Sequence, residues 1–218
     1  MMMNFIKYAL NLIFPPVCGI CGNLSDSYLC DKCSKYMKNQ QRNKTDIYID
    51  KHFTTHFWMF EYDNEIRSRI IDYKFYDKSY LYRTFVEIII SNEKACEYIN
   101  SFDYLVPVPI HKKRLKKRGY NQCELIAKEI CKRFENVEFR NDILRKVRNI
   151  IPQSTLDMEA RINNVVGAYE IVNIEGLKRK NVLLFDDVFT TGSTVDECAK
   201  LIGKSSCYDI GVFTLAKD

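Results

Sequence analysis

The chain has 218 residues, 46% of them hydrophobic and 28% charged, and a net charge of +5 from 33 basic and 28 acidic side chains. This is the length of one ordinary domain with a small addition, and no apolar run approaches the roughly 20 residues of a membrane-spanning helix. The net charge is too small by itself to indicate a polyanion partner, so the placement of the charges matters more than their sum.

Nine cysteines are present, and four of them form two close pairs. The others are scattered, mostly on apolar helix faces, where cysteine acts as a small hydrophobic residue. This usage is typical of a reducing compartment with a metal site and not of a disulfide framework. We therefore expect a cytoplasmic location.

The first predicted element is a short amphipathic helix over residues 5–14, which Pro15 and Pro16 end. A signal peptide is the first alternative, but Lys7 interrupts the apolar region and no small-residue cleavage site follows. Attachment to a membrane surface is a second alternative. So short an apolar face more often packs on its own domain, which is the interpretation that we prefer.

Two Cys-x-x-Cys pairs follow directly. Two such knuckles joined by a short loop bring four thiolates to the tetrahedral spacing of a structural zinc site, with no position left for water. A redox-active Cys-x-x-Cys is the alternative, and two knuckles this close together favour metal over it. The predicted ligands of Zn²⁺ are Cys18, Cys21, Cys30 and Cys33.

A polar stretch over residues 39–44 is interpreted as a linker. We accordingly predict a first unit over residues 1–42, comprising the helix and the zinc ribbon, and a second domain over residues 43–218. Residues 47–60 are aromatic and rich in β-formers, which predicts a hairpin or a covering pair of strands.

Helices are predicted next over residues 64–73 and from about residue 80 to residue 99. Arg67, Arg69 and Lys74 are interpreted as a solvated face of the first of these helices. A role of these cations in binding phosphate stays open.

A strand over residues 103–110 ends in two prolines, which stop strand pairing and fix an irregular loop. Residues 112–118 then hold six cations within seven positions. A solvated helix start is the plain interpretation of such a run. Its position at the end of a strand favours the binding of a polyanion. A helix opening near Asn121 is predicted to follow, with Asn121 and Glu124 as its cap pair.

Residues 145–161 form a polar stretch that carries Arg145 and Arg161. It suits a mobile lid that closes over a ligand and adds positive charge. A surface hairpin is the alternative.

The most informative stretch is an apolar run that begins at Val182 and leads into two adjacent acids, Asp186 and Asp187. A strand without polar alternation indicates a parallel sheet that is covered on both faces, and ligands bind at the carboxyl ends of such strands. The following loop offers hydroxyls, one glycine and the N–H groups of the next helix, which is the chemistry of a phosphate site. A solvated acid pair before an ordinary turn is the alternative. A closing strand is predicted over residues 210–215.

This string resembles the phosphoribosyl-pyrophosphate (PRPP) signature of type I phosphoribosyltransferases. The resemblance implies an α/β, parallel-sheet fold of that type. It also implies that Asp186 and Asp187 hold the ribose hydroxyls and act as the catalytic acids. The residues that it assigns to the 5′-phosphate loop are Thr190, Thr191, Gly192, Ser193 and Thr194.

Further motifs resemble those of the ComF/ComFC family of competence proteins. They are Pro107-Val108-Pro109, the run from Arg118 to Gln122, Arg145 with Gln153, and Arg161 with Asn164. That family carries a four-cysteine zinc ribbon before a phosphoribosyltransferase domain. The resemblance covers essentially the whole chain. It implies a role in natural transformation, in which imported single-stranded DNA enters the cytoplasm.

Three functions follow as hypotheses. The first is a PRPP-binding competence protein that binds single-stranded DNA through its basic surface. The second is an active enzyme that uses Mg²⁺ and displaces pyrophosphate from PRPP onto an unidentified acceptor. The third is an adaptor whose zinc ribbon contacts other transformation proteins. The side chains expected to meet pyrophosphate or DNA phosphate are Lys112, Lys113, Arg114, Arg118, Arg145 and Arg161.

Overall fold

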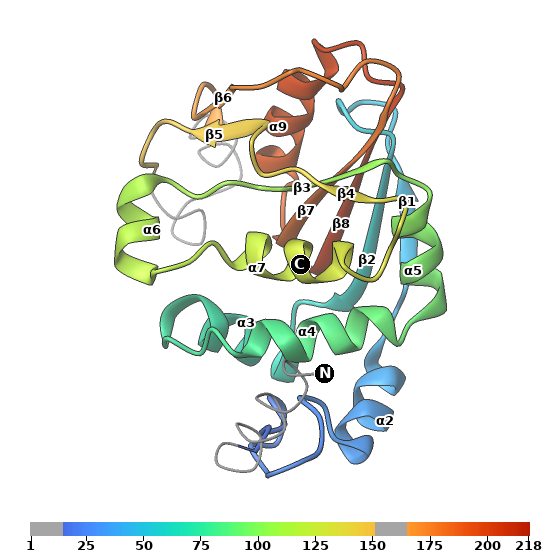
Figure 1. Ribbon diagram of the computed structural model, residues 1–218, viewed down its shortest axis with the longest axis vertical. Helices are drawn as coiled ribbons and strands as arrows, with labels where there is room; N and C mark the ends of the chain where they lie inside the picture. Colours follow the sequence, from blue (N-terminus) through green and yellow to red (C-terminus); the bar gives the residue numbers. More distant parts are fainter. Residues whose placement is uncertain (1–14, 151–164) are drawn as a thin grey trace, which may run out of the picture.

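A mostly parallel sheet lies at the centre of the computed structural model, which describes residues 15–150 and 165–218 (Figure 1). Within these residues the strand order is β1-β2-β8-β7-β3-β4, and all neighbours are parallel except the edge pair β1 and β2. A separate antiparallel pair, β5 and β6, lies apart from it. The strands are β1 (Lys44–Ile47), β2 (Thr55–Glu61), β3 (Tyr104–Pro107), β4 (Glu138–Phe139), β5 (Leu144–Lys146), β6 (Tyr169–Ile171), β7 (Asn181–Phe189) and β8 (Asp209–Lys217).

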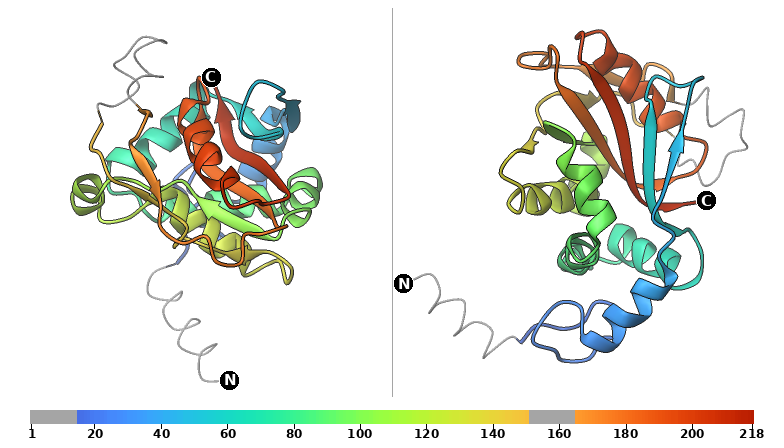
Figure 2. Two further views of the ribbon diagram at one scale, coloured as in Figure 1. Left: turned by 90° about the horizontal axis from the view of Figure 1, so that it is seen from above. Right: turned by 90° about the vertical axis from the view of Figure 1, so that its right-hand side faces the viewer.

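Helices cover both faces of this sheet (Figures 1 and 2). One apolar cluster joins α3, α4, α5 and α7 to one face, and another joins α9 and the β5–β6 pair to the opposite face. In the described part of the chain, no helix is long and apolar enough to cross a membrane. The helices are α2 (Asp31–Gln40), α3 (Asn64–Phe75), α4 (Leu81–Ile90), α5 (Glu93–Asn100), α6 (Lys112–Arg118), α7 (Gln122–Cys131) and α9 (Ser193–Gly203).

The central strand β7 explains this architecture. Its residues from Val182 to Phe185 are completely buried, because side chains from both faces of the strand enter a core. Such a strand requires covering layers on either side, which the alternation of strands and helices supplies. The predicted α/β fold with a parallel sheet is confirmed.

The four-cysteine segment packs directly against α4. A side chain at Gly19 would collide with Leu81 and Thr84, so the backbone approaches the helix more closely than any other residue would permit. Its apolar residues join the same cluster as those of α3, α4 and α7. The division of the chain at residues 42 and 43 therefore stays a prediction. The expected helix over residues 5–14 lies outside the described residues.

Two local predictions differ from the structure. The expected linker over residues 39–44 is shorter, because α2 extends to Gln40 and β1 begins at Lys44. The long helix expected over residues 80–99 is interrupted, with α4 ending at Ile90 and α5 beginning at Glu93. Asn92 causes the break, because its side chain accepts the N–H of Ala95 and so starts a new helix.

Candidate functional site

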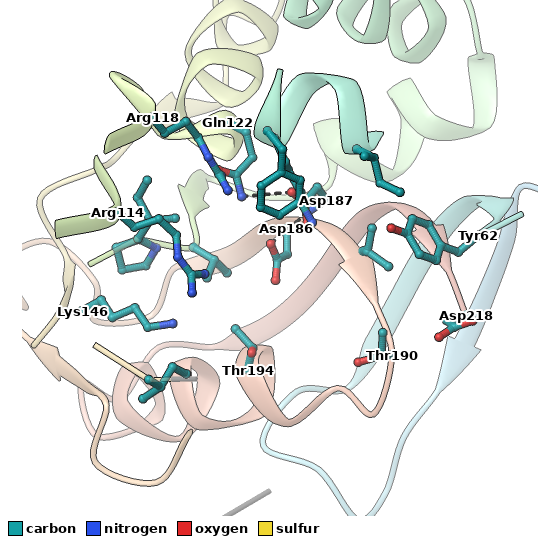
Figure 3. Close-up of a pocket in the computed structure, with 18 of the residues that line it drawn as sticks. Tyr62, Arg114, Arg118, Gln122, Lys146, Asp186, Asp187, Thr190, Thr194 and Asp218 are labelled. Atoms are coloured by element: carbon teal, nitrogen blue, oxygen red, sulfur yellow. Dashed lines mark hydrogen bonds and ion pairs between the residues drawn. The ribbon is translucent and has the colours of Figure 1, made fainter. Parts of the chain in front are cut away.

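A cavity of about 530 Å³ opens at the carboxyl ends of β3 and β7. Figure 3 shows Asp186 and Thr194 in its middle, three cationic side chains (Arg114, Arg118 and Lys146) on one side, and Tyr62 with Asp218 on the other. Its lining comprises Tyr62, Arg67, Ile71, Lys74, Phe75, Val108, Pro109, Ile110, Arg114, Arg118, Gln122, Lys146, Ile150, Tyr169, Asp186, Asp187, Val188, Thr190, Thr194 and Asp218.

The two acids reach this cavity because neighbouring strands differ in length. β3 ends at Pro107, opposite Phe185, and the N–H of Val108 donates to the Phe185 carbonyl as the chain leaves the sheet. β7 continues to Phe189. Asp186 and Asp187 thus lie just beyond the end of the adjacent strand, at the sheet edge where parallel α/β proteins bind ligands.

Asp187 is almost completely buried, with 3% of its surface exposed. Its Oδ1 lies 2.7 Å from the ammonium of Lys74, and its Oδ2 accepts a hydrogen bond of 3.0 Å from the amide of Gln122. Burial opposes the charged form of Lys74, but the attraction of Asp187 outweighs it and raises the pKa of the ammonium. Removing one partner from such a buried ion pair typically costs about 3–5 kcal/mol, because the other charge is left without compensation.

Asp186 lies in a different environment. Its Oδ1 accepts hydrogen bonds from the N–H of Asp187 at 2.9 Å and from the thiol of Cys123 at 3.4 Å. Burial, together with repulsion from Asp187, raises the pKa of Asp186 to about 7. This carboxyl therefore changes its protonation state near neutral pH. The titratable groups that face it are Asp187 on β7, Lys74 on α3, Cys123 on α7, Lys146 on β5, Tyr169 on β6 and Cys198 on α9.

The hydroxyl-bearing loop connects β7 to α9 directly beneath the cavity. Thr190 and Thr194 line the cavity, and the hydroxyls of Thr191 and Ser193 lie 2.9 Å apart. Gly192 adopts a left-handed conformation with φ of 74° and immediately precedes α9. The loop thus places hydroxyls and the positive end of a helix dipole at the base of the site, an arrangement that suits a phosphate group.

Gly192 also lies against the ring of Phe189, which stacks on the buried imidazole of His56 at 4.1 Å. We expect Gly192→Ala to destabilise the protein by at least about 1–2 kcal/mol, because an L-residue is strained at this φ and its Cβ would collide with the ring. Thermal unfolding measures the effect. Gly203→Ala, at the open end of α9, is the matched control and should leave stability unchanged or slightly raised. Equal midpoints for the two variants would contradict this prediction.

The predicted cations divide into two groups. Arg114 and Arg118 of α6 line the cavity, whereas Lys112 and Lys113 are exposed outside it. Arg145 also lies outside the lining, where it is exposed and forms an ion pair with Glu170, its Nε–Oε1 distance being 2.6 Å. Arg161 lies outside the described residues, as does most of the predicted lid over residues 145–161.

Several cavity residues carried no sequence pattern that marked them. Lys74 was interpreted as part of a solvated face, which is wrong, since it forms a buried ion pair with Asp187. Arg67 of the same helix also lines the cavity, whereas Arg69 binds Glu65 and Asp72. Lys146 donates to the Tyr169 hydroxyl at 2.8 Å. Burial, with repulsion from Arg114, lowers the pKa of Lys146 to about 8.

The four amino-terminal cysteines come together as a second candidate centre. Their sulfur atoms all lie within 4.8 Å of one another, and those of Cys21 and Cys30 are 3.9 Å apart. Zn–S bonds of about 2.3 Å in a tetrahedron require sulfur atoms about 3.8 Å apart, so the donor set fits a metal ion. Cys30 precedes α2 and Cys33 lies in its first turn, so the helix fixes this half of the cluster.

Cys123, Asp186 and Asp187 also lie close enough to share an ion. The ammonium of Lys74 already neutralises Asp187, and a divalent cation would be repelled by it. These residues therefore fit a resident metal poorly, and we assign none to them.

No family model matches the sequence. Competence protein F of Haemophilus influenzae is 27% identical over 206 residues, which is 93% of this chain and 85% of that protein. Competence protein ComFC of Streptococcus pneumoniae is 27% identical over 165 residues, 75% of this chain and 68% of that protein. DNA utilization protein YhgH of Escherichia coli is 28% identical over 116 residues, 53% of this chain and about half (49%) of that protein.

A solved structure of a hypoxanthine phosphoribosyltransferase from Staphylococcus aureus aligns with 66% of this chain and 64% of that chain, at a TM-score of 0.33 and 12% identity. The sequence matches are more informative, because the first of them extends over nearly the whole chain. The four-cysteine cluster precedes the α/β sheet, in the order that the family resemblance implies. The chain is a homologue of the competence proteins F and ComFC.

Proposed function

We propose that this protein binds PRPP and acts in natural transformation, handling imported single-stranded DNA in the cytoplasm. One observation carries the proposal: a single cavity gathers an acid pair, a hydroxyl-bearing loop at a helix start and three cations (Arg114, Arg118 and Lys146). In this arrangement the loop holds the 5′-phosphate, the acid pair forms the site of the ribose hydroxyls, and the cations hold the pyrophosphate. Mg²⁺ would arrive with PRPP, bound to its pyrophosphate and ribose oxygens. Zn²⁺ in the four-cysteine cluster would be structural.

Calorimetry with Mg²⁺ and PRPP tests the ligand, and complementation tests the role. We expect saturable heat at one site per chain. A strain that lacks the protein should regain transformation with the wild-type gene but not with one encoding Asp186→Ala/Asp187→Ala. Full transformation by that variant would show that the acid pair is not required for the biological role.

The affinity for PRPP should depend on pH through Asp186. Ribose hydroxyls donate to an ionised carboxylate, so binding favours the deprotonated form of a group whose pKa is about 7. Raising the pH from 6 to 8 changes the ionised fraction from about a tenth to about nine tenths, so affinity should rise about tenfold. Calorimetry at both pH values measures this change. The phosphates of the ligand also titrate. The pH dependence of the affinity that remains in Asp186→Asn measures their contribution. An equal pH dependence in that variant would remove Asp186 from the effect.

DNA binding is proposed for the surface formed by α6 and the turn after α3. The exposed cations of α6 follow the strand that opens the cavity. Phe75 and Tyr76 are 68% and 65% exposed, and the Arg118 guanidinium lies 5.4 Å from the centre of the Phe75 ring. Phosphates would meet the cations while unpaired bases stack on the aromatic rings.

Neutralising Lys112, Lys113, Lys116 and Lys117 to glutamine should weaken the binding of single-stranded DNA and flatten its salt dependence. The slope of log affinity against log salt should become shallower by about 0.7 for every phosphate that the variant no longer neutralises. Fluorescence anisotropy over a salt series measures it. The matched control neutralises Lys178, Arg179, Lys200 and Lys204, which precede β7 or lie at the end of α9 and directly after it, at the opposite end of the strands. An identical slope in the two variants would show that α6 is only a solvated face.

An enzyme is the second candidate, favoured by the cations on one side of Asp186. Negative charge grows on pyrophosphate as it leaves C1 of the ribose, and Arg114, Arg118 and Lys146 are placed to stabilise it. Release of pyrophosphate from PRPP in the presence of single-stranded DNA or nucleobases would support transfer. Binding without release under all these conditions would favour the binding protein.

A further inference from the structure

The two carboxylates of the site are not equivalent. Both oxygens of Asp187 already have partners, Lys74 on one and Gln122 on the other. The amide oxygen of Gln122 in turn accepts from the guanidinium of Arg118, so the amide group is fixed in the orientation that donates to Asp187. Because Asp187 is only 3% exposed, a ligand hydroxyl has little access to these oxygens, which already hold a buried ammonium and a buried amide.

Asp186 is arranged to receive a ligand. Its two hydrogen bonds to described residues are both accepted by Oδ1, and its carboxylate points into the cavity toward Thr194 (Figure 3). No residue in the described ranges donates to Oδ2, so this oxygen can accept a hydrogen bond from a ligand. Asp186 is also the more exposed of the two acids.

Lys74 is held firmly in place. The preceding residue, Tyr73, is fully buried, and its hydroxyl donates to the carbonyl of Gln122 at 2.9 Å. The hydroxyl of Tyr120 donates to the carbonyl of Tyr73, and the two rings stack 5.5 Å apart. These contacts clamp the end of α3 to the start of α7, so that Lys74 and Gln122 approach Asp187 from two fixed elements.

We propose that the acids have separate tasks: Asp186 alone binds the sugar hydroxyls, Asp187 is a buried counter-ion, and Lys74 is the positioning residue that keeps the pair at a single negative charge. This inference rests on the proposed binding of PRPP. Without Lys74, two adjacent carboxylates would face each other and a ligand that itself carries several negative charges. With Lys74, the pair attracts neutral hydroxyls and needs no metal ion of its own.

A charge-balanced double variant tests this division. We expect Lys74→Met and Asp187→Asn each to weaken the binding of Mg²⁺–PRPP more than about tenfold, because each leaves one buried charge uncompensated. The double variant K74M/D187N removes both charges and should bind within about threefold of wild type. Asp186→Asn keeps the Lys74–Asp187 pair intact but should weaken binding more than about tenfold, and K74M/D186N should not restore it.

The control is Lys78→Met, which removes a lysine that pairs with Asp72 outside the cavity lining and should leave binding unchanged. Circular dichroism and thermal unfolding establish which variants fold. If Lys74→Met and Asp187→Asn do not fold, the comparison of D186N with K74M/D187N still tests the separate tasks of the two acids, since neither of these variants leaves a buried charge unpaired. Equal loss in these two would overturn the inference while leaving PRPP binding in place. Absence of binding by wild type would instead refute the proposed function.

Discussion

Replacing Asp186 and Asp187 together by alanine should lower the affinity for PRPP to that expected for its pyrophosphate group alone. Each charge-assisted hydrogen bond contributes about 1.5–3 kcal/mol, so the loss of two such bonds, or of one bond and its supporting counter-ion, predicts a decrease in affinity of about 100-fold or more. The cavity keeps its cations, so any residual affinity should resemble that for pyrophosphate alone. Calorimetry with Mg²⁺–PRPP and with pyrophosphate distinguishes the two ligands.

Asp50→Asn is a suitable control, because this exposed aspartate lies outside the cavity lining. It should bind PRPP as wild type does. The double alanine variant leaves Lys74 without its partner, so its fold must be checked by circular dichroism before the result is interpreted. Equal affinities for wild type and a folded double variant would place the ligand elsewhere.

Removing the metal from the four-cysteine cluster should have the largest effect on stability. The purified protein is expected to contain about one zinc per chain, and Cys30→Ser should lower that content strongly. Structural zinc contributes about 10–16 kcal/mol of binding free energy in small zinc domains. Loss of even about 5 kcal/mol would lower the unfolding midpoint by about 10–20 °C in a protein of this size. Elemental analysis and thermal unfolding, with and without a chelator, measure both effects.

Cys207→Ser provides the comparison, since Cys207 is a partly buried free thiol far from the cluster in sequence and not part of it. Its zinc content should match that of wild type. A wild-type protein that contains no zinc after purification without chelators would show that the knuckles serve another purpose. A redox pair would then be the alternative to examine.

Local rules in the sequence predicted those parts of the site that lie close together along the chain. The buried run before Asp186 and the turn at Gly192 follow from apolar continuity and from the conformational freedom of glycine. Asn121 caps α7 as expected, because its side chain accepts the N–H of Cys123. Its expected partner Glu124 instead accepts from Asn141, a contact that depends on tertiary packing.

These local rules could not predict that Lys74 belongs to the site. It lies more than a hundred positions before Asp187, on a helix whose charges suggest a solvated face. The packing of Tyr73 against Tyr120 and Gln122 fixes the end of α3, from which the Lys74 ammonium reaches Asp187. The same reason applies to Lys146, whose neighbour Tyr169 comes from another strand. Ion pairs between distant segments leave no periodic trace in a sequence.

The close approach of Gly19 to α4 has a consequence for the whole molecule. Cys18, Ile20 and Leu29 belong to the same apolar cluster as Ile66 and Ile70 of α3. The four-cysteine segment and α3, which carries Lys74 to the cavity, are therefore parts of one continuous apolar core. If the cluster binds a metal ion, oxidation of its cysteines would release that ion and weaken the packing under α3. Ligand binding in the cavity would then become sensitive to oxidation of distant cysteines.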